Sequence, residues 1–251
     1  ISVNGEIYNF KDIRKELVNK YNFISKSDSE VILHGYKEWG IDKLLDKIDG
    51  MFAIVIFDIN KNKIYLVRDR MGIKPLYYSL MDDKISWASE LKALADFFSS
   101  KHLNTDYTAL YDFLTYSYIP TPKTLYKNIQ KLEPAHYIEY DLGEKKALKK
   151  KYWNIRIRED SITIKQASEH LKHIINKSVK SHMISDVPVG FFLSGGIDSS
   201  LVTMVARDLS DRVSAFSIGF DIEEHSELKF AKNFANNLGI NHKSKILTSG
   251  I

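Results

Sequence analysis

One stretch of this chain, VPVGFFLSGGIDSSLV at residues 187–202, constrains the fold more than any other. An apolar run at 191–193 is long enough for a buried strand, and the glycines Gly195 and Gly196 then interrupt it. Apolar residues recur at helical spacing up to Leu209. A strand, a glycine-rich turn and a helix N-terminus in this order make a phosphate cradle. The glycines let the backbone approach an anion, and the first helical N–H groups have no partner within the helix.

The motif differs from two familiar phosphate loops. No lysine follows the glycines as in GxxxxGKS/T, and the glycine spacing is not GxGxxG. An ordinary strand–turn–helix would also fit SGG alone. The longer pattern SGGxDS behind an apolar strand resembles the pyrophosphate loop of the ATP pyrophosphatases. This resemblance implies cleavage of ATP between its α- and β-phosphates, with AMP transferred to a carboxylate or carbonyl oxygen.

The resemblance also implies roles for individual residues. Asp198 would face the phosphates through Mg²⁺, since an acidic side chain in a phosphate site requires a cation between them. Its alternative role is a carboxylate at a helix start, worth about 0.3–1 kcal/mol. Leu193 and Ile218 end two strands and would frame the ATP with their backbone groups, whereas the alternative for each is plain core packing. The residues expected to hold the pyrophosphate through N–H and hydroxyl groups are Ser194, Gly195, Gly196, Ser199 and Ser200.

The second half of the chain alternates helices and strands. A long helix is expected over 164–183, a strand over 213–218, and a helix over 228–238 that ends at Gly239. This order implies a parallel sheet with right-handed crossovers, whose ligands bind at the carboxyl ends of the strands. With the resemblance, it predicts an α/β parallel-sheet ATP-pyrophosphatase domain over 156–251, incomplete at its C-terminus.

The first half has the pattern of hairpin-linked strands with helices between them. MFAIVIFDI at 51–59 predicts a strand buried on both faces, and 63–67 returns the chain as a second strand. This pattern is typical of an α+β domain. Aromatic and leucine residues at helical spacing within 104–118 predict a helix whose aromatic side chains lie in the core. Prolines then force an extended path, and we expect the first domain to comprise residues 1–155.

Four motifs of this first half occur in order, namely VNGEIYN at 3–9, SDSEVIL at 27–33, RDRMGIKPLYY at 68–78 and ASELKAL at 88–94. Taken alone, Asn4-Gly5 would be a hairpin corner and Asp28 a helix N-cap. Taken together, the motifs resemble the glutaminase domain of the class II amidotransferases. That domain is an N-terminal-nucleophile hydrolase, a sandwich of two antiparallel sheets between helices. Arg68 and Asp69 are expected to pair inside the domain as structural residues.

The resemblance implies a glutamine site in the first half. Asn4 and Gly5 would form the oxyanion hole, and Glu6 and Asp28 would hold the amino end of glutamine. The chemistry agrees with these roles, because donors placed where the oxyanion develops are each worth about 10²–10³ in rate. Two carboxylates suit the ammonium group of a free amino acid.

The nucleophile of that family is a cysteine at the mature N-terminus, whose own α-amino group acts as base. This chain contains no cysteine and begins at Ile1, inside the VNGE motif and without methionine. We therefore expect a fragment that lacks both ends and does not hydrolyse glutamine alone. The lack of cysteine also excludes disulfides and cysteine-based zinc sites within these residues, and it suits a cytosolic protein.

Glutaminase motifs followed by SDVPVGFFLSGGIDSS resemble, over nearly the whole chain, the glutamine-hydrolysing asparagine synthetases. The resemblance implies glutamine, aspartate and ATP as substrates, Mg²⁺ as cofactor and a homodimer. Aspartate would be activated as β-aspartyl-AMP, and ammonia from glutamine would displace AMP to give asparagine. Two alternatives stay open. One is a related amidotransferase that acts on a sugar or secondary-metabolite carboxylate, or closes a lactam ring with an inactive glutaminase half. The other is a binding protein that keeps only the fold.

Composition argues against other classes of partner. The net charge of +4 is modest, and KKALKKK at 145–151 has no aromatic residues between its lysines, so it predicts a solvated loop rather than a nucleic-acid site. No apolar run approaches the roughly 20 residues that cross a bilayer. The sequence therefore predicts small-molecule substrates, without nucleic acid or membrane as partners.

Overall fold

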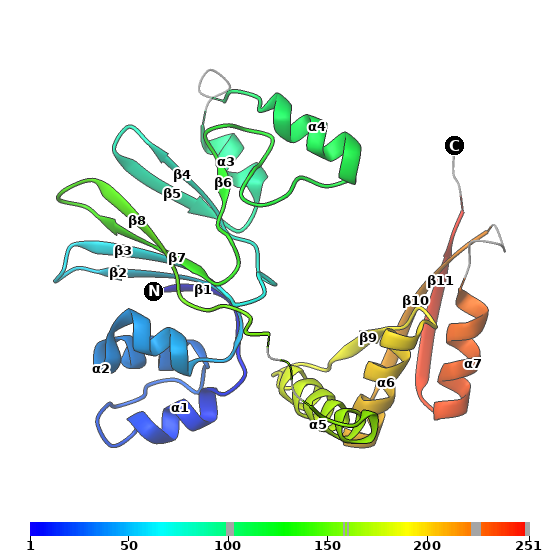
Figure 1. The fold of residues 1–251 in the computed structure, drawn as a ribbon. Helices are drawn as coiled ribbons and strands as arrows, with labels where there is room; N and C mark the ends of the chain where they lie inside the picture. The colour runs from blue at the N-terminus through cyan, green and yellow to red at the C-terminus, as the bar shows by residue number, and fades with distance from the viewer. Residues whose placement is uncertain (99–102, 158, 160, 222–226, 249–251) are drawn as a thin grey trace. The chain divides into compact units, whose positions relative to one another are not determined.

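The chain forms two compact units, Ile1–Ile157 and Arg158–Ile251. The computed structural model describes residues 1–98, 103–157, 159, 161–221 and 227–248. Figure 1 shows antiparallel sheets with helices in the first unit, and a small parallel sheet with helices in the second. Within these described ranges, no helix combines the length and the apolar character needed to cross a membrane.

A five-stranded antiparallel sheet, in the order β1-β2-β3-β7-β8, lies at the centre of the first unit. β2 and β3 confirm the strands predicted at 51–59 and 63–67. The prediction of a loop at 145–151 is wrong, because these lysines form the edge strand β8. This strand pairs with β7, and its side chains are exposed, as predicted for a solvated segment. An edge strand needs only backbone partners, and lysines discourage further pairing there. The strands are β1 Ser2–Ile7, β2 Gly50–Asp58, β3 Lys63–Arg68, β7 His136–Asp141 and β8 Lys146–Lys151.

A second, three-stranded antiparallel sheet has the order β5-β4-β6. β4 Tyr77–Met81 and β5 Lys84–Ala88 form a hairpin, and β6 Gln130–Lys131 pairs with β4. The hairpin turn consists of Asp82 and Asp83, whose φ angles are +50° and +56°. Positive φ at both turn residues is what a type I′ hairpin requires.

Successive side chains of β2 point to opposite faces of the sheet, so they contribute to two separate layers of the core of the first unit. Ile54 and Ile56 face the helices α1 Phe10–Leu17 and α2 Ser29–Lys47, which cover one face of the five-stranded sheet in Figure 1. Val55 faces the second sheet, on the opposite side. The layers are thus helices, sheet and sheet, which agrees with the α+β expectation, whereas the N-terminal-nucleophile assignment stays a prediction.

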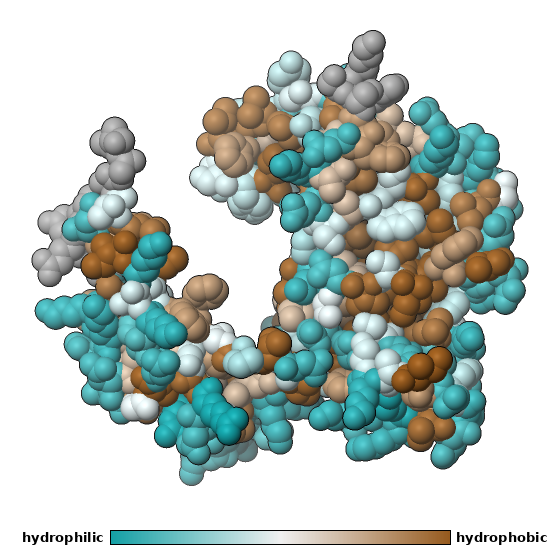
Figure 2. All heavy atoms as spheres, turned by 180° about the vertical axis from the view of Figure 1, so that it is seen from behind, coloured by the Kyte–Doolittle hydropathy of each residue, from teal (hydrophilic) through white to brown (hydrophobic). Residues whose placement is uncertain are grey.

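Two further helices, α3 Leu91–Phe97 and α4 Tyr107–Tyr116, complete the first unit. The prediction that the aromatic residues of α4 lie in the core is wrong, because Tyr107 and Tyr111 are 74% and 71% exposed. Figure 2 shows hydrophobic side chains gathered over this helix. Helical spacing identifies residues that share a face, but the rest of the fold decides whether that face is covered.

The second unit has a three-stranded parallel sheet in the order β11-β10-β9, as the α/β prediction requires. One face, with Phe191 and Ala215, packs against the helices. The other face carries exposed apolar side chains, among them Phe192 and Ile218. The elements are α5 Ile164–His182, β9 Gly190–Phe192, α6 Ile197–Leu209, β10 Ser214–Phe220, α7 Leu228–Leu238 and β11 Asn241–Leu247.

Candidate functional site

The NGE motif lies inside β1, against β2. Gly5 pairs with Phe52, so the alternative of a hairpin corner at Asn4-Gly5 is wrong. The pairing explains the glycine, because φ at Gly5 is +148° and a Cβ there would lie 2.0 Å from the carbonyl oxygen of Met51. No other residue lets two backbones approach so closely. Asn4 and Glu6 flank this glycine with exposed side chains.

Asp28 binds the C-terminal end of the same strand. It occupies the N-cap position of α2, as predicted, but its side chain makes no capping hydrogen bond. Its Oδ2 atom instead accepts a hydrogen bond from the N–H of Ile7 at 2.7 Å. Because Ile7 directly follows Glu6, the SD motif and the NGE motif meet at this strand end.

Ser89 also belongs to this site, although sequence reasoning did not single it out. The Nδ2 atom of Asn4 donates a hydrogen bond to the Oγ atom of Ser89 at 3.0 Å. Ser89 stands in the ASELKAL motif, between β5 and α3. The only available signal was the presence of that motif beside NGE, and spacing along the chain does not reveal the contact.

Asp69 and Arg68 form a buried polar cluster beside the β1–β2 pair, which we call the Asp69 clasp. Asp69 is fully buried, and its carboxylate accepts four backbone N–H hydrogen bonds of 2.9–3.2 Å. Arg68 is also buried and donates to three backbone carbonyl groups. The expected structural role is thus supported, but the two side chains bind backbone instead of each other. The N–H donors to Asp69 belong to Phe52, Met71, Ile73 and Lys74.

Tyr8 directly follows the strand β1 and lies near several carboxylates. Burial, with the charges of Asp69, Asp49 and Glu6, raises the pKa of Tyr8 to about 12. The Tyr8 hydroxyl therefore stays protonated at neutral pH. Nearby carboxylates favour a cationic group such as an ammonium.

The second candidate site is the loop that joins β9 to α6. Ser194 Oγ lies 3.0 Å from Ser199 Oγ and accepts a hydrogen bond from the N–H of Gly196 at 3.2 Å. Gly196 is the N-cap of α6 and has no side chain to bind the first helical N–H groups, which are left for an anion. Gly195 has φ of +90°, and a Cβ there would lie 2.8 Å from Cβ of Phe230 in α7. Glycine therefore allows the loop to lie against that helix.

The first turn of α6 holds Asp198, Ser199 and Ser200. The N–H of Ser200 already donates to the carbonyl group of Gly196, so its hydroxyl is the group left for a ligand. Asp198 is exposed at the same turn. In the described part of the chain, no cluster of three or more histidine or acidic residues forms a metal site. A single carboxylate nevertheless fits Mg²⁺, which is often held by one or two carboxylates together with phosphates of the substrate.

Leu193 directly follows β9, and Ile218 lies within β10, which continues to Phe220, so neither residue is the last of a strand as predicted. Leu193 is buried, its N–H donates to the carbonyl group of Phe216 at 2.9 Å, and its own carbonyl group accepts from Ser217 Oγ. The backbone N–H of Leu193 is therefore occupied, and its carbonyl oxygen has one lone pair left to accept a hydrogen bond from a ligand. Ile218 exposes 57% of its surface on the face of β10 that no helix covers.

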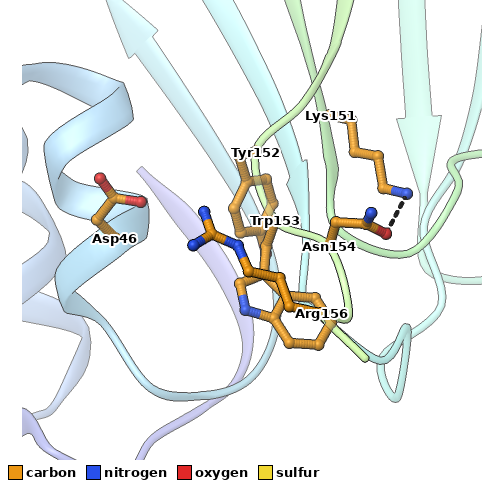
Figure 3. Close-up of a pocket in the computed structure, with 6 residues that line it drawn as sticks. All are labelled: Asp46, Lys151, Tyr152, Trp153, Asn154 and Arg156. Atoms are coloured by element: carbon orange, nitrogen blue, oxygen red, sulfur yellow. Dashed lines mark hydrogen bonds between the residues drawn. The ribbon is translucent and has the colours of Figure 1, made fainter. Parts of the chain in front are cut away.

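A cleft in the first unit lies apart from the predicted residues. Figure 3 shows Tyr152, Trp153 and Arg156 lining it opposite Asp46, with Lys151 donating to Asn154 at 2.8 Å. None of the residues predicted for glutamine binding lines this cleft. The C-terminal end of β1, where the NGE motif meets Asp28 of the SD motif, remains the candidate glutamine site.

Comparison with known proteins gives matches over both units. Residues 1–153 match the family model described as a glutamine amidotransferase domain, and residues 170–250 match that described as asparagine synthase. The glutamine-hydrolyzing asparagine synthetase 1 of Bacillus subtilis (strain 168) is 37% identical over 99% of this chain and 39% of its own length. A putative glutamine-hydrolyzing asparagine synthetase 2 of Methanocaldococcus jannaschii is 38% identical over 88% of this chain and 43% of its own length.

The chain spans about two fifths of the length of these curated relatives. A solved structure of glutamine phosphoribosylpyrophosphate amidotransferase from B. subtilis has a TM-score of 0.43 and 16% identity, over 97% of this chain and 44% of that one.

Proposed function

Because this chain belongs to the glutamine amidotransferase domain family and also matches the asparagine synthase family, we propose that it acts in a glutamine-hydrolysing asparagine synthetase. Residues 1–155 would serve glutamine hydrolysis, and residues 156–251 would serve the ATP-dependent activation of aspartate. The observation that carries the proposal is that one chain holds both candidate sites. The NGE and SD motifs meet at β1, and the SGG loop leads into an uncapped helix N-terminus.

In the first unit, the proposed roles follow from the position of each group. The amide of Asn4 and the N–H of Gly5 would donate to the oxyanion that forms when the glutamine amide is attacked. Glu6 and Asp28 would hold the ammonium group of glutamine. The attacking cysteine implied by the family is not among these 251 residues, so this chain supplies binding and stabilisation.

In the second unit, the proposed site holds ATP by its phosphates. The N–H groups at the start of α6 and the hydroxyl groups of Ser194, Ser199 and Ser200 would bind the pyrophosphate, while Leu193 and Ile218 would frame the adenine. Mg²⁺ held by Asp198 would neutralise phosphate charge.

The reaction proposed for the ATP site of the second unit uses the ammonia that glutamine hydrolysis in the first unit would release. A side-chain carboxylate oxygen of aspartate attacks the α-phosphorus, the bond to pyrophosphate breaks, and β-aspartyl-AMP forms. Ammonia released from glutamine then attacks the activated carbonyl carbon, and AMP leaves to give asparagine.

The direct test follows all products in the full-length protein with glutamine, aspartate, Mg²⁺ and ATP. AMP and pyrophosphate formed together with asparagine and glutamate would support the proposal. AMP formed only with another carboxylate as acceptor would keep the site assignments and change the substrate. ADP, or no nucleotide turnover, would contradict the proposed role of the SGG loop.

Asp198→Ala tests the Mg²⁺ assignment within the same protein. We expect AMP formation to be abolished and glutamine hydrolysis to persist, because the substitution removes the carboxylate proposed to reach the cation. Asp208→Ala is the matched control, since Asp208 is an exposed carboxylate near the other end of α6. Full synthetase activity in Asp198→Ala would exclude a role for this residue in binding Mg²⁺.

The homodimer rests on the resemblance alone. Light scattering on the full-length protein would test it, and a monomer mass would exclude it.

A further inference from the structure

The carbonyl group of Leu193 is held by a hydrogen-bond relay that crosses three strands. Leu193 follows β9 and immediately precedes Ser194 of the SGG loop. Its carbonyl oxygen accepts a hydrogen bond from Oγ of Ser217 on β10. The same Oγ lies 2.7 Å from Nε2 of His242 on β11. Leu193 and Ser217 are 1% and 7% exposed, so water does not substitute readily for these contacts.

The direction of each hydrogen bond in the relay follows from counting protons. A carbonyl oxygen can only accept, so the single proton of the Ser217 hydroxyl points toward Leu193. The Ser217 oxygen is then the acceptor for its other partner, and Nε2 of His242 must carry the proton that it donates. Burial, together with the positive charge of Lys232, lowers the pKa of His242, which favours the neutral ring. The ring is thus the Nε2–H tautomer.

We propose that Ser217 and His242 are positioning residues for the phosphate loop, which they hold through the Leu193 carbonyl group. This inference rests on the proposed ATP site. The strand β9 is short, and its register with β10 ends at Phe192. Beyond that point the chain is tied to β10 by the N–H and the carbonyl of Leu193. The relay therefore sets where the backbone leaves the sheet and where Ser194 and Gly195 begin the turn.

The test measures binding of an ATP analogue with a methylene bridge between the α- and β-phosphates, by calorimetry on the full-length protein with Mg²⁺. Ser217→Ala removes the donor to Leu193 and should weaken binding about five- to tenfold, the effect of one hydrogen bond. His242→Leu should weaken binding in the same direction but less, since the Ser217 hydroxyl remains. His242→Gln should bind within about twofold of wild type, because the glutamine amide donates a hydrogen bond of the same kind.

The pair of substitutions at His242 separates positioning from packing. If His242 only fills space, Leu should be tolerated at least as well as Gln, and this order would overturn the inference. Ser244→Ala is the matched control, because Ser244 pairs with Ser217 in register and is exposed. Thermal unfolding of each variant establishes that it is folded.

Two further outcomes overturn the inference in different ways. Binding by folded Ser217→Ala within twofold of wild type would overturn the positioning role alone. Failure of the wild-type protein to bind the analogue would contradict the proposed ATP site and the inference with it.

Discussion

The two candidate sites of this chain are assembled in opposite ways. In the first unit, Asn4, Asp28 and Ser89 come from three separate motifs and meet only when the sheets and helices form. In the second unit, the loop residues are nearly consecutive, and Ser194 contacts Ser199 directly. The residues of the first site therefore come together only through the fold, whereas those of the second are neighbours in the sequence, in a turn that β10 and β11 hold through Ser217 and His242.

A carboxylate from each unit shows the same contrast. Asp69 is fully buried and binds the backbone at four points, while Asp198 is exposed in the first turn of a helix. Loss of a buried carboxylate leaves its donors without partners, whereas loss of an exposed one leaves them to water. Substitutions that disrupt the fold of the first unit should thus damage the first site.

The largest expected effect is that of Asp69→Ala. The substitution leaves one buried and three part-buried N–H groups without their acceptor, and we expect the first unit to lose about 3–4 kcal/mol of unfolding free energy. Tryptophan fluorescence during urea denaturation measures this unit specifically, because Trp39, Trp87 and Trp153 all lie in it. The matched control is Asp141→Ala, which removes an acceptor from an exposed turn. Equal losses for both variants would contradict the contrast.

Gly5→Ala should have the next largest effect. Its Cβ would lie 2.0 Å from the Met51 carbonyl oxygen, so β1 must move away from β2. We expect a loss of about 2–3 kcal/mol in the first unit and loss of glutamine hydrolysis in the full-length protein. Gly40→Ala shares a positive φ but meets nothing within 4 Å, so it isolates the clash and should retain hydrolysis. Normal hydrolysis in Gly5→Ala would remove Gly5 from the oxyanion site.

Ser89→Ala tests whether the discontinuous site is functional. The Asn4 amide loses its acceptor and becomes free to rotate, so kcat for glutamine hydrolysis should fall about five- to tenfold with KM little changed. Steady-state kinetics on the full-length protein measures both constants, and Ser86→Ala on β5 is the control. A rise in KM at constant kcat would instead place Ser89 in substrate binding.

The smallest expected effect concerns the pH dependence of the first unit. Hydrogen bonds from the Ser25 hydroxyl and the Ile24 N–H lower the pKa of Glu30 from 4.5 to about 2. Because the folded-state pKa lies below that of the unfolded chain, this stabilisation is complete above pH 4.5 and is lost as the pH falls toward 2. Denaturation midpoints should therefore separate wild type from Glu30→Gln at pH 6 and converge toward pH 3. A constant difference would rule out this linkage.

The same contrast decides how much of the molecule could be predicted. The loop at Ser194–Ser200 and the hairpin of β2 and β3 follow from local patterns, so their positions could be predicted from the sequence. The Asn4–Ser89 contact joins residues 85 positions apart, and no local rule encodes it.

Three departures from local preference share a cause, which is that tertiary contacts override it. Asn4-Gly5 has turn chemistry but is held in β1 by pairing with β2. Asp28 occupies the N-cap of α2, but its side chain accepts from the N–H of Ile7 and caps no backbone N–H of its own helix. The aromatic residues of α4 have the spacing of a core helix, yet that face stays exposed. At Asp28 the departure from the local rule coincides with the proposed glutamine site.

The Asp69 clasp also determines how the first unit exchanges its amide hydrogens with solvent. One carboxylate joins Phe52 of β2 to the turn at Met71–Lys74, so both segments share one acceptor residue. We expect the carboxylate to protect the amides of Phe52, Ile73 and Lys74 from exchange as long as Asp69 stays in place. We expect this turn to exchange more slowly than a turn whose amides bind only water, although it contains neither helix nor strand.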